Sequence, residues 1–284
     1  INNVLKETGL EGADAFDKAL LLNALGKLEA AEHSDEYKDV ITGELDKLIQ
    51  DNTINIGEND LVNYMYGNAC YSVGKNDIAV NIAKQTERQS RTESGYFTGA
   101  EGSRCLCTAF KALSFYMNYE TRDDGKEHYN DIIAQYNVIH EDLYKNTSSK
   151  AFKDSDALEA LCYYSAALID TMEVMDQALY EIYRQLMDYY KETVKDVLAT
   201  GISGAEKNPA KAPYELVFAY ALLKGCRMKA VLTEKYEDAA LAIYEKYSDV
   251  SEKDAAEFAL CYSEAVRNRD YQDYGRNNGG RLWS

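Results

Sequence analysis

The chain has very little proline: only Pro209 and Pro213 occur among its 284 residues. Proline lacks a backbone N–H and clashes with the preceding turn, so it interrupts helices. Its scarcity therefore favours an all-helical protein, and 46% hydrophobic residues are enough for one sizeable core. The sequence also has no strand–turn–helix stretch with a glycine-rich loop, which argues against a nucleotide-binding fold.

Long apolar runs and an excess of basic residues are also missing. No stretch approaches the roughly 18 consecutive apolar residues of a membrane span, and no charged-then-apolar leader opens the chain. The formal net charge of −17 repels nucleic-acid phosphates and anionic membrane surfaces. We therefore expect a soluble protein that binds neither nucleic acid nor membrane, cytoplasmic unless a signal was removed. A short anionic sugar would need a local basic contact.

The cysteines and histidines lack the spacing of a metal site. The six cysteines are Cys70, Cys105, Cys107, Cys162, Cys226 and Cys261, with no CxxC pair and no histidine nearby. We therefore expect no zinc site, and no other metal or cofactor is indicated. Each cysteine falls in an apolar segment, where a thiol behaves as a small hydrophobe. We predict six reduced cysteines packed in the core.

Two kinds of helical segment alternate along the chain. Segments that are apolar nearly all the way round are expected at 11–32, 59–73, 103–119, 156–172, 213–226 and 254–266. Amphipathic segments are expected at 35–50, 76–90, 125–144, 175–198 and 233–247, and residues 2–9 would supply a sixth. A helix that is apolar on all sides must be surrounded by protein, whereas a helix that is apolar on one face only lies at the protein surface.

This alternation, with a period of roughly 40 to 50 residues, predicts an all-α, single-domain (α/α)6 barrel over residues 1–284. Six inner helices would form a ring inside six outer ones. An open helical solenoid is the alternative, but its end helices usually carry a polar outer face. Here the first and last apolar segments are as apolar as the middle ones, which favours closure. The polar tail 268–284 is expected to be a surface strap or to fold over a ring opening.

Carboxylates that lead into the inner helices are the candidate catalytic residues, because the mouth of a closed ring is its natural concave site. Asp60, Asp156 and Glu159 are the acids that we consider as proton donor and base on a sugar. A structural interpretation competes with this one. Asp154, Ser155 and Asp156 stand just before an apolar run and are typical of a helix N-cap.

Tyrosines and one arginine near the same loops are candidate substrate contacts, because aromatic faces stack against sugars. These residues are Tyr64, Tyr96, Arg104, Tyr163 and Tyr214. Most of the 24 tyrosines instead fall at helical spacing, which predicts amphipathic packing with the hydroxyl reaching water. The sequence itself does not show that the candidates converge on one ligand.

Three stretches carry a resemblance to a known family: FDKALLLNALGKLEAAEHSDEYKDVITGELDKLI, RTESGYFT and ELVFAYALLKGCR. They resemble the first hairpin, the RTxxGGFWH turn and the SAMFAYALLKGVR segment of glycoside hydrolase families 88 and 105, the unsaturated glucuronyl and rhamnogalacturonyl hydrolases. The resemblance is colinear over nearly the whole chain. It implies an (α/α)6 barrel and hydrolysis of unsaturated uronyl oligosaccharides.

The same resemblance implies that the site motifs are altered. The family helix WLDGLYMAxPFxxRY corresponds to CLCTAFKALSFYMNY, so its proton-donating aspartate falls on Cys107 and its tryptophan on Cys105. The RGNGW motif corresponds to EALCY, which puts Glu159 at the arginine and Tyr163 at the tryptophan. A thiol is a poor general acid beside a tuned carboxylic acid. The family mechanism is therefore not expected to operate unchanged.

Three functions remain open. The chain could be a diverged sugar-processing enzyme, with an acid before the second inner helix retained as Glu58 or Asp60. It could be a non-catalytic pseudoenzyme that binds a carbohydrate or a protein partner at the ring mouth. A helical interaction scaffold is the third. The sequence indicates neither the natural ligand nor the oligomeric state.

Overall fold

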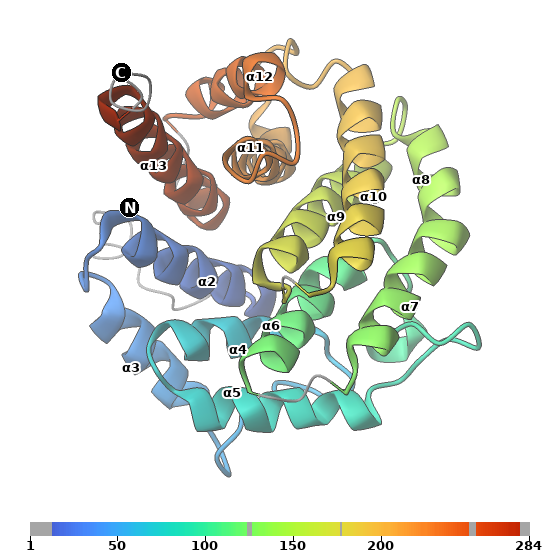
Figure 1. Ribbon diagram of the computed structural model, residues 1–284. Helices are drawn as coiled ribbons and strands as arrows, with labels where there is room; N and C mark the ends of the chain where they lie inside the picture. Colours follow the sequence, from blue (N-terminus) through green and yellow to red (C-terminus); the bar gives the residue numbers. More distant parts are fainter. Residues whose placement is uncertain (1–12, 124–126, 177, 250–253, 279–284) are drawn as a thin grey trace.

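The computed structural model describes residues 13–123, 127–176, 178–249 and 254–278, and this part of the chain is all-α, without a β-strand. Within it, six inner helices follow one another around a ring (Figure 1): α2 (Ala15–Glu32), α4 (Val62–Ser72), α6 (Ser114–Arg122), α9 (Ser155–Val174), α11 (Ala212–Arg227) and α13 (Ala255–Asn278). Each inner helix packs against the next one along the chain.

The ring is closed by its last helix. α13 packs against α2, and Figure 1 shows the two side by side although they lie at opposite ends of the sequence. An open solenoid would leave these two helices apart. The prediction of an all-α (α/α)6 toroid is confirmed.

The outer layer consists of helices that lie over the ring. They are α3 (Lys38–Leu48), α5 (Asn76–Ala83), α7 (Tyr129–Ile139), α8 (Lys145–Lys150), α10 (Tyr180–Ala199) and α12 (Thr233–Lys246). A π-helical turn, η4 (His140–Tyr144), joins α7 to α8, and a 3-10 turn, η1 (Lys84–Arg88), extends α5. Residues 2–9, predicted as a further outer helix, lie outside the described residues.

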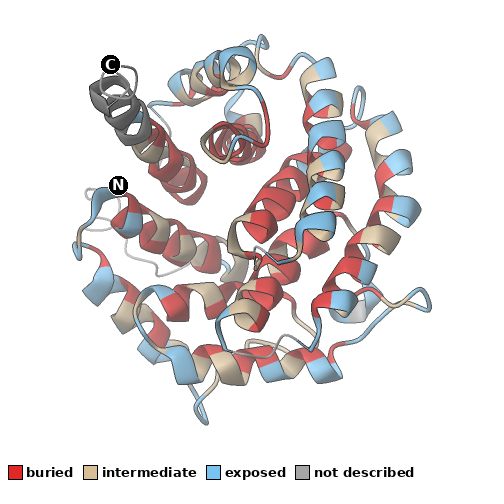
Figure 2. Ribbon diagram, viewed as in Figure 1, coloured by how far each residue is buried: buried red, intermediate tan, exposed pale blue. Residues whose placement is uncertain are grey.

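Burial separates the two layers as the apolar pattern predicts (Figure 2). Every residue of α11 from Tyr214 to Cys226 is buried, whereas the outer helix α3 buries only Ile41 and Leu45. An inner helix has neighbours on all sides, so each of its faces must be compatible with a protein interior. No helix in the described ranges is long and apolar enough to cross a membrane.

Local signals set the helix starts. The Asp154 side chain accepts hydrogen bonds from the backbone N–H groups of Asp156 and Ala157, so Asp154 is the N-cap of α9. Pro209 lies in the 3-10 turn η5 (Pro209–Lys211) and Pro213 in the first turn of α11. Both prolines occupy helix starts, where the missing N–H has no helical partner to lose.

Two boundaries differ from the expectation. The segment predicted as helical from residue 103 becomes helical only at residue 107, and then passes through the π-helical turn η3 (Ala109–Leu113) into α6. At the other end α13 continues to Asn278, so the polar tail is helical over 268–278. Its last residues, 279–284, lie outside the described residues.

Glycine lets two inner helices approach closely at one point, which provides a test of the ring packing. A Cβ added at Gly67 of α4 would collide with the Phe115 ring of α6, whereas a Cβ at Gly43 of α3 meets nothing within 4 Å. We expect Gly67→Ala to lower the free energy of unfolding by about 1–3 kcal/mol through overpacking. Gly43→Ala should raise it by about 0.5–1 kcal/mol. Urea unfolding measures both, and equal effects would contradict the packing.

Candidate functional site

Side chains from three inner-ring elements meet at the end of the ring where the inner helices begin. The ring of Tyr163 on α9 lies 5.8 Å from that of Phe16 on α2 and 5.0 Å from that of Phe110 on η3, between centroids. The Nζ atom of Lys111 lies 5.2 Å from the Phe16 ring centroid. This group of residues is the N-terminal mouth, an aromatic surface with one basic side chain beside it.

Glu257, in the first turn of α13, supplies an unusual acid at this mouth. It is only 4% exposed. Burial raises the pKa of its carboxyl group to about 8, and the negative charges of Asp17, Asp254 and Glu159 add to the rise; its own backbone N–H opposes it. Burial penalises the charged form more than the helix start favours it. Glu257 is therefore largely a neutral carboxylic acid at neutral pH, the state that a proton donor requires.

The candidates on α9 lie close to this acid. Glu159 is exposed, and partial desolvation followed by the neighbouring Asp156 raises the pKa of its carboxyl group. Tyr163 is buried, and burial together with Glu257 and Glu159 raises the pKa of its hydroxyl group. Asp156 is exposed at the start of the helix. The structure thus brings Glu159 and Tyr163 into the electrostatic field of Glu257.

Tyr214, on the neighbouring helix α11, is also part of this region. It is 4% exposed, and among the described residues its buried hydroxyl group has no hydrogen-bond partner. Burial raises the pKa of this hydroxyl group, and Glu215 and Glu159 add to the effect. An unpartnered buried hydroxyl group costs free energy in the absence of a ligand or water.

The predicted residues before α4 and α6 form a separate region. Tyr64 is fully buried and donates a hydrogen bond of 2.8 Å to Oε1 of Gln89, and Tyr96 is 1% exposed. Both tyrosine side chains are therefore packed inside the protein in this region. Arg104 is exposed and lines an open cavity of about 650 Å³. Asp60 accepts a hydrogen bond of 3.0 Å from the backbone N–H of Val62, which closes the turn into α4.

The cysteine prediction is wrong for two of the six residues. Cys105 and Cys107 are half-buried and joined by a disulfide, while Cys70, Cys162, Cys226 and Cys261 are buried and free. Residues two apart in a helix do not face each other, so a helix beginning at 103 would keep the sulfurs apart. Because Cys105 precedes the helix, the two Cα atoms can lie 5.2 Å apart in disulfide geometry.

Sequence reasoning missed Glu257, Asp17, Phe16, Phe110 and Lys111. One signal for Glu257 was present: it lies within AAEFALCYSEAV, a helix apolar on nearly all sides. An acid there must be buried, and a buried acid without a cation shifts its pKa upward. In the part of the chain that the structure covers, no group of three or more His, Cys, Asp or Glu residues could hold a metal ion.

The ring of inner helices inside outer helices defines the class of the fold as an (α/α)6 toroid. Within this class the chain is similar to a solved structure, a glycoside hydrolase from family 105 of C. acetobutylicum ATCC 824, with a TM-score of 0.74. The two share 17% sequence identity, over 93% of this chain and 98% of the other. No protein-family model matches the chain, and no curated protein sequence matches it. At this identity the similarity establishes the fold.

The disulfide predicts a specific thiol count. Alkylation of the unfolded protein without reductant should modify four thiols, those of the free cysteines, and six after reduction. The Cys105→Ala variant releases Cys107 and should show five in both conditions. Mass spectrometry counts the modified residues, and six modified thiols without reductant would disprove the bond.

The raised pKa of Glu257 predicts a pH-dependent stability. The unfolded carboxyl group titrates near pH 4.3 and the folded one near 8, so the native state binds the additional proton between these values. Stability due to this group is therefore present at low pH and lost as pH rises through the window. We expect Glu257→Gln to gain on the order of 2–4 kcal/mol relative to wild type between pH 5 and 8.

Urea unfolding at both pH values measures this gain. Glu234→Gln, a matched change of an exposed first-turn acid on outer helix α12, should show an offset from wild type that is nearly independent of pH. An offset for Glu257→Gln that is equally flat would contradict the raised pKa.

Proposed function

We propose that the chain is a glycoside hydrolase-like protein of carbohydrate metabolism that acts at the N-terminal mouth. The single observation that carries the proposal is Glu257: a buried carboxyl group, protonated near neutral pH, near Tyr163, whose ring packs against those of Phe16 and Phe110. The similarity of the fold to a family 105 glycoside hydrolase and the family resemblance of the scaffold motifs support it.

The substrate class that suits the mouth is a short uronyl oligosaccharide. Phe16 offers an apolar ring face for a sugar, and Lys111 stands beside that ring with a positive charge for a uronyl carboxylate. A chain with a net charge of −17 needs such a local cation to hold an anionic sugar. The unsaturated uronyl oligosaccharides of the family that the sequence resembles meet both requirements.

In the proposed reaction Glu257 transfers its proton to the double bond of the unsaturated sugar. Water adds to the resulting oxocarbenium ion and gives up a proton to a neighbouring carboxylate, for which Glu159 is our candidate. The hemiketal ring then opens to a ketone and a hemiacetal, and breakdown of the hemiacetal releases the remaining sugar. Glu159 returns its proton to solvent, and Glu257 takes one up from solvent. Proton donation requires the neutral acid, so activity should decline above about pH 8 as Glu257 ionises. Asp60 and Asp156 remain predictions for the same chemistry.

Cys107 explains why the donor would be a different residue here. The resemblance puts the family's aspartate on Cys107, and this sulfur is bonded to that of Cys105. A disulfide sulfur carries no proton to donate. The same observation favours a second candidate function, a non-catalytic protein that binds carbohydrate at the N-terminal mouth.

The test follows the near-ultraviolet absorbance of an unsaturated uronyl disaccharide with the purified protein. We expect the absorbance to fall with wild type, and Glu257→Gln to lower the rate by about 10²-fold or more, the usual contribution of a general acid. Glu234→Gln should retain the wild-type rate, because this exposed acid lies on outer helix α12.

Each outcome decides between the functions. Turnover that survives Glu257→Gln would disprove the assignment of the donor. An unchanged absorbance with a rise in melting temperature on adding the disaccharide would favour the binding protein, because ligands stabilise the state that binds them. No turnover and no rise would refute both.

A further inference from the structure

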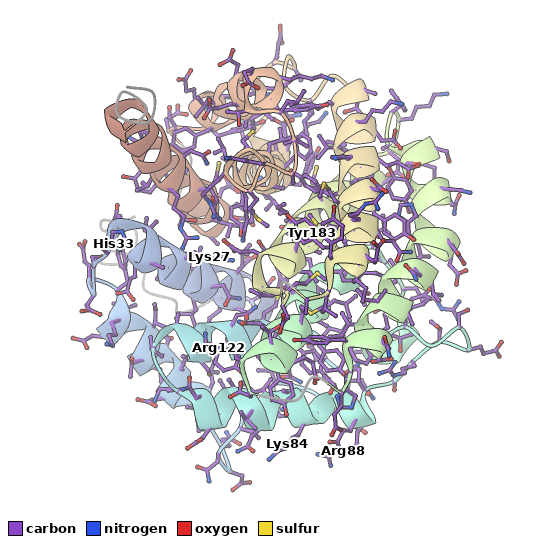
Figure 3. All side chains as sticks on the ribbon, in the orientation of Figure 1. Lys27, His33, Lys84, Arg88, Arg122 and Tyr183 are labelled. Carbon is purple, nitrogen blue, oxygen red and sulfur yellow. A yellow bond between two sulfur atoms is a disulfide. The ribbon has the colours of Figure 1, made fainter. Side chains whose placement is uncertain are left out.

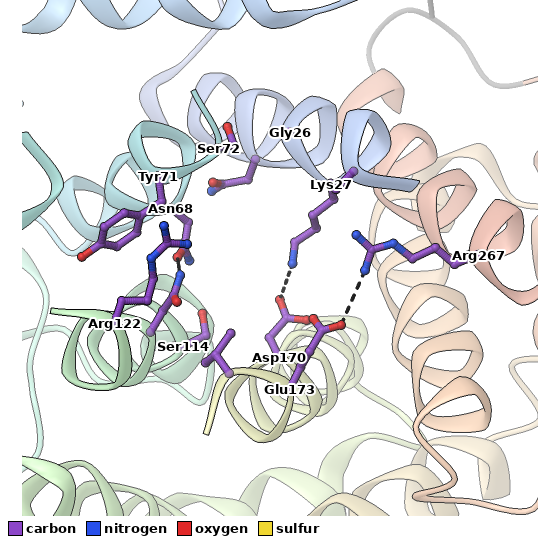
Figure 4. A pocket seen from close by; sticks show the side chains of 14 residues that line it. Gly26, Lys27, Asn68, Tyr71, Ser72, Ser114, Arg122, Asp170, Glu173 and Arg267 are labelled. Atoms are coloured by element: carbon purple, nitrogen blue, oxygen red, sulfur yellow. Dashed lines mark hydrogen bonds and ion pairs between the residues drawn. The ribbon is translucent and has the colours of Figure 1, made fainter. Parts of the chain in front are cut away.

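The opposite end of the ring contains a cavity that the proposed function does not use. It has a volume of about 270 Å³ and lies where α2, α4, α6 and α9 end, with Arg267 of α13 on one wall. Its lining combines charged and amide side chains with the apolar surface of Gly26, Ala30 and Val174 (Figure 4). Drug-sized ligands occupy sites of roughly 300–1,000 Å³, so this cavity suits a smaller molecule, about the size of one monosaccharide.

The two carboxylates that line the cavity, Asp170 and Glu173, form ion pairs with basic residues of the neighbouring helix α11. Asp170 Oδ1 accepts hydrogen bonds from the Tyr220 hydroxyl group at 2.5 Å and from Lys224 Nζ at 2.6 Å. Glu173 forms ion pairs with Lys224 and, at 2.6 Å, with Arg227. Lys224 and then Lys27 hold the pKa of both carboxyl groups below the usual range despite burial, and Arg227 adds to this effect at Glu173. The carboxylates therefore do not give the cavity an unbalanced negative charge.

Three cations line the cavity itself. Lys27 lies 3.5 Å from Asp170, and Arg267 lies 3.5 Å from Glu173 and 3.6 Å from the buried Glu264; Figure 4 shows Lys27 and Arg267 on one side of the cavity with Arg122 on the other. Figure 3 places Lys27 and Arg122 toward the middle of the molecule, whereas other labelled cations lie at its rim. Three carboxylates, Asp170, Glu173 and Glu264, are outnumbered by five cations, so the surroundings of the cavity are locally cationic in a chain of net charge −17; the cations are Lys27, Lys224, Arg227, Arg267 and Arg122.

Desolvation strengthens the case for an anion. Burial lowers the pKa of Lys27, even though Asp170 and Glu173 oppose this effect. A negative group beside its Nζ atom would offset that penalty. Arg122, which is exposed and lies with its Cζ atom 4.4 Å from the Tyr71 ring centroid, offers a planar guanidinium for a carboxylate.

The uncharged side chains that line the cavity include a hydrogen-bond acceptor without a donor. Asn23 donates through Nδ2 to the Met65 carbonyl at 2.9 Å, but within the described ranges its buried Oδ1 has no partner. Asn118 and Asn68, hydrogen-bonded to each other at 2.9 Å, add further amide groups. A ligand hydroxyl group would satisfy the Asn23 oxygen, and amide-lined walls are suited to several hydroxyl groups.

Helix ends alone do not account for these features. Helix C-termini carry partial negative charge and attract basic residues, which explains part of the cation cluster. That effect explains neither the unpartnered acceptor on Asn23 nor the polar cavity between Arg122 and Lys27.

We propose that this cavity is a second small-molecule site, which takes a polyhydroxylated carboxylate of monosaccharide size, a sugar acid. The carboxylate lies between Arg122 and the Lys27–Arg267 side, and a hydroxyl group donates to Asn23 Oδ1. The site is independent of the N-terminal mouth, since its residues come from the opposite ends of the inner helices.

Isothermal titration with D-glucuronate tests the proposal, with D-glucose and acetate as matched probes that lack the charge or the hydroxyl groups. We expect D-glucuronate to bind at least tenfold more tightly than either. Arg122→Met should weaken D-glucuronate binding by about tenfold or more, the usual effect of losing a charge-assisted hydrogen bond. Arg184→Met, a matched change at an exposed arginine of α10, should leave it unchanged.

The variants also separate this site from the N-terminal mouth. Lys111→Met, which removes the cation beside the N-terminal mouth, should leave this D-glucuronate affinity unchanged. Binding that Lys111→Met abolishes and Arg122→Met spares would assign the ligand to the mouth and overturn the proposal. Equal binding of acetate and D-glucuronate would overturn the sugar-acid class, and no binding of any probe would overturn the site.

Discussion

The packing of α13 against α2 is the contact on which the rest of the structure depends. It closes the ring, so each inner helix is enclosed along most of its length, and the ionisable residues in its buried part, such as Lys224 and Glu257, are withdrawn from water. Such residues must find a partner or change their protonation. Lys224, Asp170 and Glu173 form a buried ion cluster between α11 and α9, whereas Glu257 on α13 stays neutral at neutral pH.

The shared direction of the inner helices gives the two ends of the ring different chemistry. Helix starts collect carboxylates, and at the N-terminal mouth several of them lie close enough to raise one another's pKa. Helix ends collect cations, and there Lys224 and Arg227 compensate the acids of α9. One end is thus suited to donating a proton and the other to holding an anion, within a single scaffold.

The sequence resemblance implies that the chain departs from the family where chemistry would be expected. It puts the family's aspartate on Cys107, which is joined in a disulfide, while the buried acid Glu257 lies on a different helix. The fold tolerates this because it depends on the apolar faces of the ring rather than on the residues at its mouth. A shared architecture at 17% identity establishes the fold and leaves the chemistry to the residues of the site.

Periodicity alone determined the architecture: fully apolar segments must be enclosed and one-faced segments must cover them, so alternation of the two predicts a double ring. The residue types Asp154, Ser155 and Asp156 before an apolar run also predicted a helix N-cap there, because capping is local, and Asp154 is the N-cap of α9. The disulfide, the neutral Glu257 and the burial of Tyr64 were decided only in three dimensions. They depend on where a helix begins and on which side chains from distant segments lie nearby. The hydrophobic periodicity of the sequence predicts neither of these. Local sequence encodes which face is apolar, but a pKa depends on the charges and burial that the closed ring creates.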